Sequence, residues 1–257
     1  MNVWLLFVLV IVISALVAVG AILMANRLVS ASVAKDLTSK LSPFVTTVAL
    51  VYGALLGFTV VVAWEQFSSA EVNVANEAST LATMYRQTVA MPVHEQQEIR
   101  ALLRRYTTAV QGPEWKKQED GGGISDMARG AITDMYRVLG GQDPDAGSAA
   151  INGEFLGQLT VLASERNTRV LDAEPRIPFL LWCGLIFGGA LLVGLTAFIG
   201  LESTRAHMIL SGAVAVLLGL LLFVVYCLDH PFGSQVGITP APFQHSLEVF
   251  EAVDSGK

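Results

Sequence analysis

The sequence has few charged residues for its length. Only 15% of its 257 residues are charged, whereas 53% are hydrophobic. An ordinary soluble domain has roughly a quarter of its residues charged, so this composition excludes that class of protein. The net charge of −6 leaves no basic surplus, and we therefore expect no nucleic-acid partner.

Residues that carry catalysis or metal binding are also scarce. Both cysteines, Cys183 and Cys227, fall inside apolar runs, and the four histidines are scattered without the spacing of metal ligands. The sequence has no P-loop, nucleophile elbow, dinucleotide fingerprint or zinc-protease motif. We therefore expect no enzyme activity, no cofactor and no metal site.

Four long apolar segments dominate the sequence instead. They cover residues 4–24, 44–63, 178–201 and 208–228. As helices rising about 1.5 Å per residue, they are long enough to cross a bilayer core of about 30 Å. The polar stretch between the second and third has helical periodicity and no strand pattern. We predict an all-α integral membrane protein, with four transmembrane helices and a membrane-proximal helical bundle between spans 2 and 3.

This prediction divides the chain into four parts. They are a first transmembrane helix pair (residues 1–63), a helical extramembrane domain continuous with span 2 (64–177), a second transmembrane pair (178–228), and a proline-rich segment with a short tail helix (229–257). The tail helix has Phe243, Leu247 and Phe250 on one side. We expect this apolar side to pack back on the helical domain.

Prolines and glycines mark the expected helix ends. Ser42 followed by Pro43 predicts a helix start, and no further proline occurs before Pro92. One long helix should therefore run out of the membrane without a break. Gly112 and Pro113 predict the end of the next helix, with residues 114–123 forming a mobile loop.

One stripe follows the long helix at alternating spacings of four and three residues. It consists of Thr46, Leu50, Gly53, Gly57, Val60, Trp64, Phe67, Glu71, Val74, Ala78, Leu81 and Tyr85. Such spacing turns one face continuously toward a partner helix. Two interpretations stay open: a bundle core within one subunit, or a seam around the axis of an oligomer.

In an oligomer, the membrane half of this stripe would line a pore. The candidate pore-lining residues are Thr46, Leu50, Gly53, Gly57, Val60 and Trp64. Glu65 and Glu71 would form acidic rings at the pore mouth, which attract cations. Alternatively, the threonine hydroxyls bond back to their own helix and the acids are solvated or paired.

The leading functional hypothesis is passive ion conduction by a homo-oligomer, with a cation preference. Its partners would be membrane lipid and inorganic ions. The alternative is a non-conducting membrane scaffold or sensor whose helical domain binds a partner.

Glu71 or Glu77 with Arg166 or Arg169 forms a second candidate group. In an antiparallel bundle, the polar half of the long helix begins beside the end of the last helix before span 3. Glu77, Arg166 and Arg169 are therefore clamp candidates between helices. The alternative interpretation is a switch that senses a ligand or pH through these charges.

The order and spacing of several short pieces resemble the bestrophin-like family of bacterial membrane proteins. These pieces are Gly53 to Phe58, Trp64-Glu65-Gln66, Glu77-Ala78, Tyr85-Arg86, Arg166 with Arg169, Trp182, and Leu228-Asp229-His230-Pro231-Phe232-Gly233. The resemblance covers nearly the whole chain. It implies two membrane helix pairs flanking a helical domain, a location in a bacterial cytoplasmic (inner) membrane and a homo-oligomeric ion channel. In bestrophins proper this channel is a pentamer with a pore lined by the second helix.

Two interpretations remain for the side of the membrane on which the helical domain lies. The resemblance implies that this domain lies in the cytoplasm. In contrast, the loop of residues 25–41 has Arg27, Lys35 and Lys40 against Asp36, and the positive-inside rule would place that loop in the cytoplasm and the helical domain outside. The three arginines near span 3 (166, 169 and 176) nearly balance this count.

Overall fold

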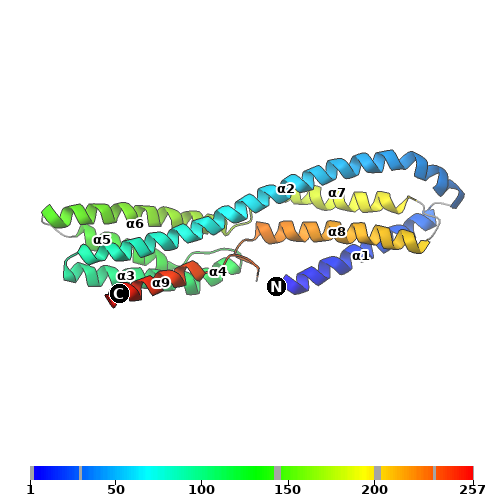
Figure 1. The fold of residues 1–257 in the computed structure, drawn as a ribbon. Coiled ribbons are helices and arrows are strands. Elements are labelled where there is room, and N and C mark those ends of the chain that lie inside the picture. Colours follow the sequence, from blue (N-terminus) through cyan, green and yellow to red (C-terminus); the bar gives the residue numbers. More distant parts are fainter. Residues whose placement is uncertain (1–2, 29–30, 142–145, 200–203, 234–235, 257) are drawn as a thin grey trace. The chain divides into compact units, whose positions relative to one another are not determined.

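The computed structural model describes residues 3–28, 31–141, 146–199, 204–233 and 236–256. All its regular elements in these ranges are helical (Figure 1). They are α1 (Val3–Leu28), α2 (Ala31–Gln87), a 3-10 turn (Thr88–Ala90), α3 (Val93–Ala109), a π-helical turn (Val110–Glu114), α4 (Trp115–Glu119), α5 (Asp126–Gly140), α6 (Ala146–Asp172), α7 (Phe179–Ala197), α8 (Thr204–Asp229) and α9 (Ala241–Asp254). The all-α prediction is therefore confirmed.

Two compact units make up the chain. The membrane unit comprises residues 1–66 and 176–229, and the helical unit comprises residues 67–175 and 230–257. Helix α2 contributes to both, because its 57 residues continue through position 66. The side chains of Lys35 and Asp36, which entered the charge count of the first loop, lie outside the described residues.

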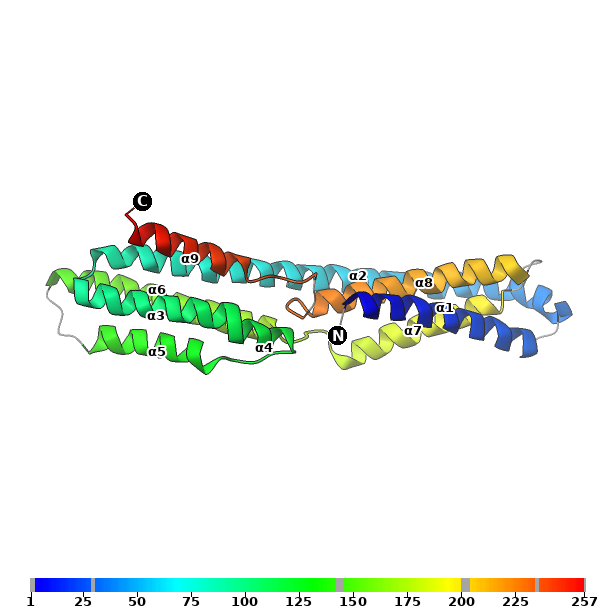
Figure 2. The same ribbon diagram turned by 90° about the horizontal axis from the view of Figure 1, so that it is seen from below.

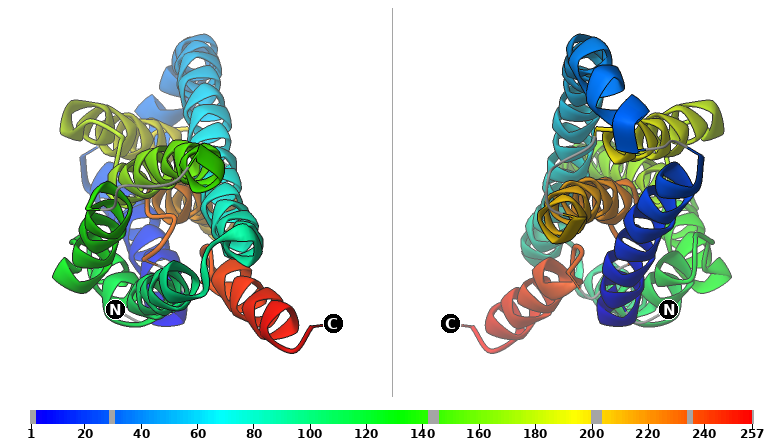
Figure 3. Two further views of the ribbon diagram at one scale, coloured as in Figure 1. Left: turned by 90° about the vertical axis from the view of Figure 1, so that its left-hand side faces the viewer. Right: turned by 90° about the vertical axis from the view of Figure 1, so that its right-hand side faces the viewer.

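The membrane unit contains four helices that are long and apolar enough to cross a membrane, as predicted. Helix α1 packs against α8 and α7, and α7 packs against α8 (Figure 3, right). The Tyr52 ring of α2 lies against Gly188 and Gly189 of α7, and its hydroxyl donates to the Leu185 carbonyl at 2.9 Å. A glycine pair thus lets an aromatic ring of one span approach the backbone of another.

The helical unit surrounds one apolar core. Helices α3, α5 and α6 lie side by side (Figure 2), and the end-on view shows them around the same centre as the second half of α2 (Figure 3, left). Phe155, Leu159 and Leu162 of α6 are fully buried in this core. Helix α9 adds Phe243 and Phe250, both fully buried, so the tail helix packs on the helical unit as expected.

The predicted helix start at Ser42 and Pro43 is wrong. Helix α2 begins at Ala31, and Pro43 lies inside it. Proline lacks the N–H that would bond to the carbonyl four residues earlier, so one backbone hydrogen bond is missing there. The neighbouring hydroxyls of Thr46 and Thr47 donate to the carbonyls of Ser42 and Pro43, each at 3.0 Å. The backbone nevertheless stays helical through a residue that ends most helices.

The predicted loop of residues 114–123 is also wrong in its first half. The chain continues from α3 through the π-helical turn, which includes Gly112 and Pro113, into α4. Trp115 is only 3% exposed and packs edge-on against Phe232 and Phe243. Burial of this indole gains more than the proline loses locally.

Candidate functional site

The membrane half of the α2 stripe is not covered by the rest of the membrane unit. Leu50 is 74% exposed and Trp64 is 60% exposed. Gly53 and Gly57 are exposed, and a Cβ added to either would meet no atom within 4 Å. Val60 is half-buried. Most of this stripe is therefore free to face lipid, water or another subunit.

The threonines in this half bond back to their own helix. Thr46 is exposed and donates to the Ser42 carbonyl, and the buried Thr59 donates to the Leu55 carbonyl at 2.9 Å. A hydroxyl that has used its proton still has acceptor capacity. Thr46 therefore adds an oxygen acceptor to the exposed stripe.

Both acidic mouth candidates are exposed. Glu65 lies in the membrane unit and Glu71 in the helical unit, and neither forms an ion pair with a residue that the structure describes. Glu71 lines a cleft of about 440 Å³ between α2 and residues 236–242. The carboxylates are thus solvated within one chain.

Beyond Phe67 the same stripe enters the core of the helical unit. Val74, Leu81 and Tyr85 have no exposed surface, and Ala78 is 3% exposed. Here the interpretation as a bundle core within one subunit is correct. Glu71 remains the exposed exception in this half.

A buried ion pair joins α2 to α6 in the helical unit. Arg169 donates from Nε to Glu77 Oε2 at 2.6 Å and from Nη2 to Glu77 Oε1 at 3.2 Å. The Tyr106 hydroxyl of α3 donates to the same Oε1 at 2.6 Å. Neither charged side chain has exposed surface, so both rely on these contacts to compensate lost hydration.

Glu114, at the end of the π-helical turn, is the second buried carboxylate of this network. It accepts from Arg169 Nη2 at 2.8 Å, from Arg166 Nη2 at 2.6 Å and from the Ser125 backbone N–H at 2.7 Å. Arg169 Nη1 also donates to Gln118 Oε1 at 2.7 Å. With Glu77, two carboxylates therefore meet two guanidinium groups, and the buried charge is balanced.

The environment changes the pKa values of these groups in opposite directions. Burial alone would lower the pKa of Arg169, but the attraction of Glu77 raises it. Burial alone would raise the pKa of Glu114, but hydrogen bonds from Arg166 and Arg169 lower it. Burial and the neighbouring Glu77 raise the pKa of Tyr106 well above its usual value. The network thus favours a charged Arg169, a charged Glu114 and a neutral Tyr106.

Sequence reasoning named Glu77, Arg166 and Arg169 but missed Glu114 and Gln118. The pattern of a glycine and a proline before them pointed to a loop. Trp115 between them was the available signal, because a large aromatic side chain rarely sits in a mobile loop.

Asp229 is a further residue whose role could not be read from the sequence. It is 4% exposed and accepts from the backbone N–H groups of Arg176 and Ile177, each at 2.9 Å. The Trp182 indole donates to its other oxygen at 3.3 Å. The end of α8 thereby holds the segment that leads into α7.

The tail helix is held by Asp254 near its end. This carboxylate accepts from Arg100 at 2.7 Å, from Arg104 at 2.6 Å and from the Tyr85 hydroxyl at 2.7 Å. Phe250, one turn earlier, stacks on the Tyr85 ring with centroids 4.0 Å apart. The tail is thus tied to both α2 and α3.

No cluster of metal ligands occurs among the described residues. Of the four histidines, His94 and His245 are exposed in the helical unit, and His207 is buried in the membrane unit. Two groups of titratable side chains converge in the helical unit: the buried network around Arg169 and the partly exposed contact of Asp254 with Arg100 and Arg104.

Comparison with known proteins gives a family and a fold. The Bestrophin-like domain matches residues 12–243. Crystal structures of two single-substitution variants of a bacterial bestrophin homologue from Klebsiella pneumoniae are similar in fold. One has a TM-score of 0.75 and 14% identity, covering 100% of this chain and 99% of that one; the other has a TM-score of 0.72 and 14% identity, covering 98% and 99%.

The comparison with curated proteins gives no match. The family match covers most of the chain and agrees with the four spans, the helical unit and the structural similarity along the full length. This chain is therefore an integral membrane protein that belongs to the Bestrophin-like family.

Proposed function

We propose that this chain assembles into a homo-oligomer that conducts ions passively along an axis lined by the membrane half of α2. Family membership supports a channel-type protein. The observation that carries the proposal is the open stripe of Leu50, Gly53, Gly57 and Trp64, which no part of the membrane unit covers. Contact with lipid alone would not favour two small residues one turn apart on an exposed helix face. Close approach of neighbouring helices around an axis does favour them.

The proposed ion preference follows from charge. Glu65 and Glu71 are exposed and unpaired with any described residue. Repeated by rotational symmetry, each would form a ring of carboxylates that raises the local cation concentration. Thr46 would add oxygen acceptors within the pore. By family analogy we favour a pentamer in a bacterial cytoplasmic membrane.

Planar-bilayer recordings test this proposal. The purified protein in asymmetric KCl should give a cation-selective reversal potential, and Glu65→Gln and Glu71→Gln should each shift it toward zero. Glu98→Gln, at an exposed carboxylate of α3, is the matched control and should leave selectivity unchanged. Anion selectivity would refute the acidic rings, and the absence of current from a folded oligomer would favour the scaffold or sensor.

Family analogy also leads us to propose that the helical unit lies in the cytoplasm. Gly122→Cys, in a Cys183→Ser and Cys227→Ser background, places a thiol in the glycine turn of that unit. A membrane-impermeant maleimide should label it in inverted vesicles and not in intact cells. Labelling in intact cells would support the charge count of the first loop instead.

A further inference from the structure

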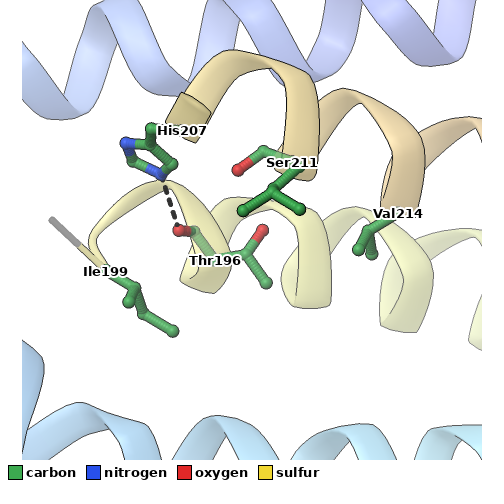
Figure 4. A pocket seen from close by; sticks show the side chains of 6 residues that line it. Thr196, Ile199, His207, Ser211 and Val214 are labelled. Carbon is green, nitrogen blue, oxygen red and sulfur yellow. Dashed lines mark hydrogen bonds between the residues drawn. The ribbon is translucent and has the colours of Figure 1, made fainter. Parts of the chain in front are cut away.

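A groove lies on the membrane unit where α7 ends and α8 begins (Figure 4). It has a volume of about 240 Å³. The residues that line it are Thr196, Ile199, His207, Leu210, Ser211 and Val214. From His207 to Val214 it follows α8 for roughly 10 Å, at about 1.5 Å per residue.

The groove has apolar walls and two polar groups deep inside. Leu210 is 58% exposed and Val214 is 36% exposed, whereas His207 is 7% and Ser211 only 4% exposed. The Ser211 hydroxyl points to the same side as the imidazole (Figure 4) and makes no hydrogen bond with a described residue. A hydroxyl that makes no hydrogen bond within the protein has its proton available to an acceptor, so Ser211 can donate to a polar group of a molecule in the groove.

The imidazole also retains binding capacity. His207 Nε2 lies 3.1 Å from the Thr196 carbonyl oxygen, and because a carbonyl only accepts, Nε2 carries the proton. Nδ1 makes no hydrogen bond within the described part of the chain. With the proton on Nε2, Nδ1 accepts a hydrogen bond.

The surroundings favour an amphiphile with a negative head. Leu210 and Val214 lie within the span that begins at Arg205, where water in an apolar groove is unfavourable and an acyl chain is the available occupant. Three of the candidate spans end on this membrane face at Arg27, Lys40 and Arg205, and all three side chains are exposed. This surplus of basic residues attracts anionic lipid.

We propose that this groove binds one anionic phospholipid. Its acyl chain lies along Leu210 and Val214, and its phosphate accepts a hydrogen bond from Ser211. The exposed Arg205, in the first turn of α8, adds positive charge beside the phosphate. The site does not depend on whether the protein conducts ions.

Native mass spectrometry of the full-length oligomer in detergent tests the proposal. Phosphatidylglycerol should be retained at least tenfold better than phosphatidylcholine of the same chain length. Ser211→Ala should weaken this retention about tenfold, as expected for a lost hydrogen bond to a charged group. Leu210→Trp should fill the groove and abolish it. The matched control is Ile209→Trp, which changes a 71% exposed residue at the same depth outside the groove and should retain the lipid.

Three outcomes would overturn the proposal. Equal retention of the two phospholipids would show that the groove does not select an anionic head group. Equal loss of bound lipid in Leu210→Trp and Ile209→Trp would show that the lipid is general annular lipid and is not held in the groove. Displacement of phosphatidylglycerol by equimolar oleate would identify a free fatty acid as the occupant. Because Ser211→Ala is a small change, it keeps the test decisive even if the tryptophan variant does not fold.

Discussion

Replacing Arg169 with methionine should destabilise the helical unit more than any surface substitution. The change removes one of two positive charges from a buried group that holds two carboxylates, Glu77 and Glu114. Glu77 would keep only the hydrogen bond from Tyr106, whereas Glu114 would keep Arg166. Removing one partner of a buried ion pair costs about 3–5 kcal/mol. For a chain of this size that corresponds to roughly 10 °C in Tm.

The double variant Glu77→Met with Arg169→Met separates charge from packing. It removes one charge of each sign and leaves the Glu114–Arg166 pair balanced. Apolar replacement of a buried pair is often neutral, so the double variant should recover most of the stability that Arg169→Met loses. Arg105→Met is the control, because Arg105 pairs with Asp134 at the exposed surface, where a bridge contributes at most about 1 kcal/mol.

The assay is thermal unfolding followed by tryptophan fluorescence, since Trp115 is buried in the same unit. The pKa of Glu114 is lowered in the folded state, so its contribution to stability is present above the unfolded pKa and is lost as the pH falls through the folded value. The wild-type protein should therefore lose stability as the pH falls below the usual pKa of a glutamate side chain. The reasoning would be refuted if Arg169→Met shifted Tm no more than Arg105→Met, or if the double variant were no better than the single one.

Three further substitutions test contacts elsewhere in the fold. Gly188→Ala would place a Cβ 2.7 Å from the Tyr52 ring, and this overpacking should reduce the free energy of unfolding by about 1–3 kcal/mol and so lower Tm. In Gly184→Ala the added Cβ meets no atom within 4 Å, so its Tm should not fall. Equal Tm values for the two variants would contradict this packing. Asp229→Ala leaves two backbone N–H groups without their acceptor and should reduce the free energy of unfolding by about 1–2 kcal/mol. An unchanged Tm in the same assay would argue against this role of Asp229. Phe250→Ala removes a fully buried ring and should cost about 3–5 kcal/mol, with faster amide exchange in α9; unchanged exchange would show that the tail is held without it.

The spans and the long helix could be predicted because they follow from composition and periodicity alone. A bilayer requires about 20 apolar residues per helix, and the four segments supply them. The stripe of α2 was visible for the same reason, since its spacing is local in sequence. The two different environments of this stripe could not be predicted, because burial of Val74 and exposure of Leu50 depend on which other helices lie nearby.

The polar network was predictable only in part. Glu77 and Arg169 lie on neighbouring helices that the topology brings together, but Glu114 follows a proline that usually ends a helix. Tertiary burial of Trp115 overrides that local signal. Pro43 shows the same limit, because helix α2 continues through it.

The exposure of Gly53 and Gly57 affects which substitutions α2 can tolerate. Alanine at either position would meet no atom of its own chain and would favour the helix by about 1 kcal/mol. The folding of a single subunit therefore provides no reason to keep glycine there, and each one makes the isolated helix easier to bend. In the oligomer that we propose, selection on these two positions would act through the assembly, whereas selection on Ala78 or Leu81 of the same helix acts through the stability of each subunit.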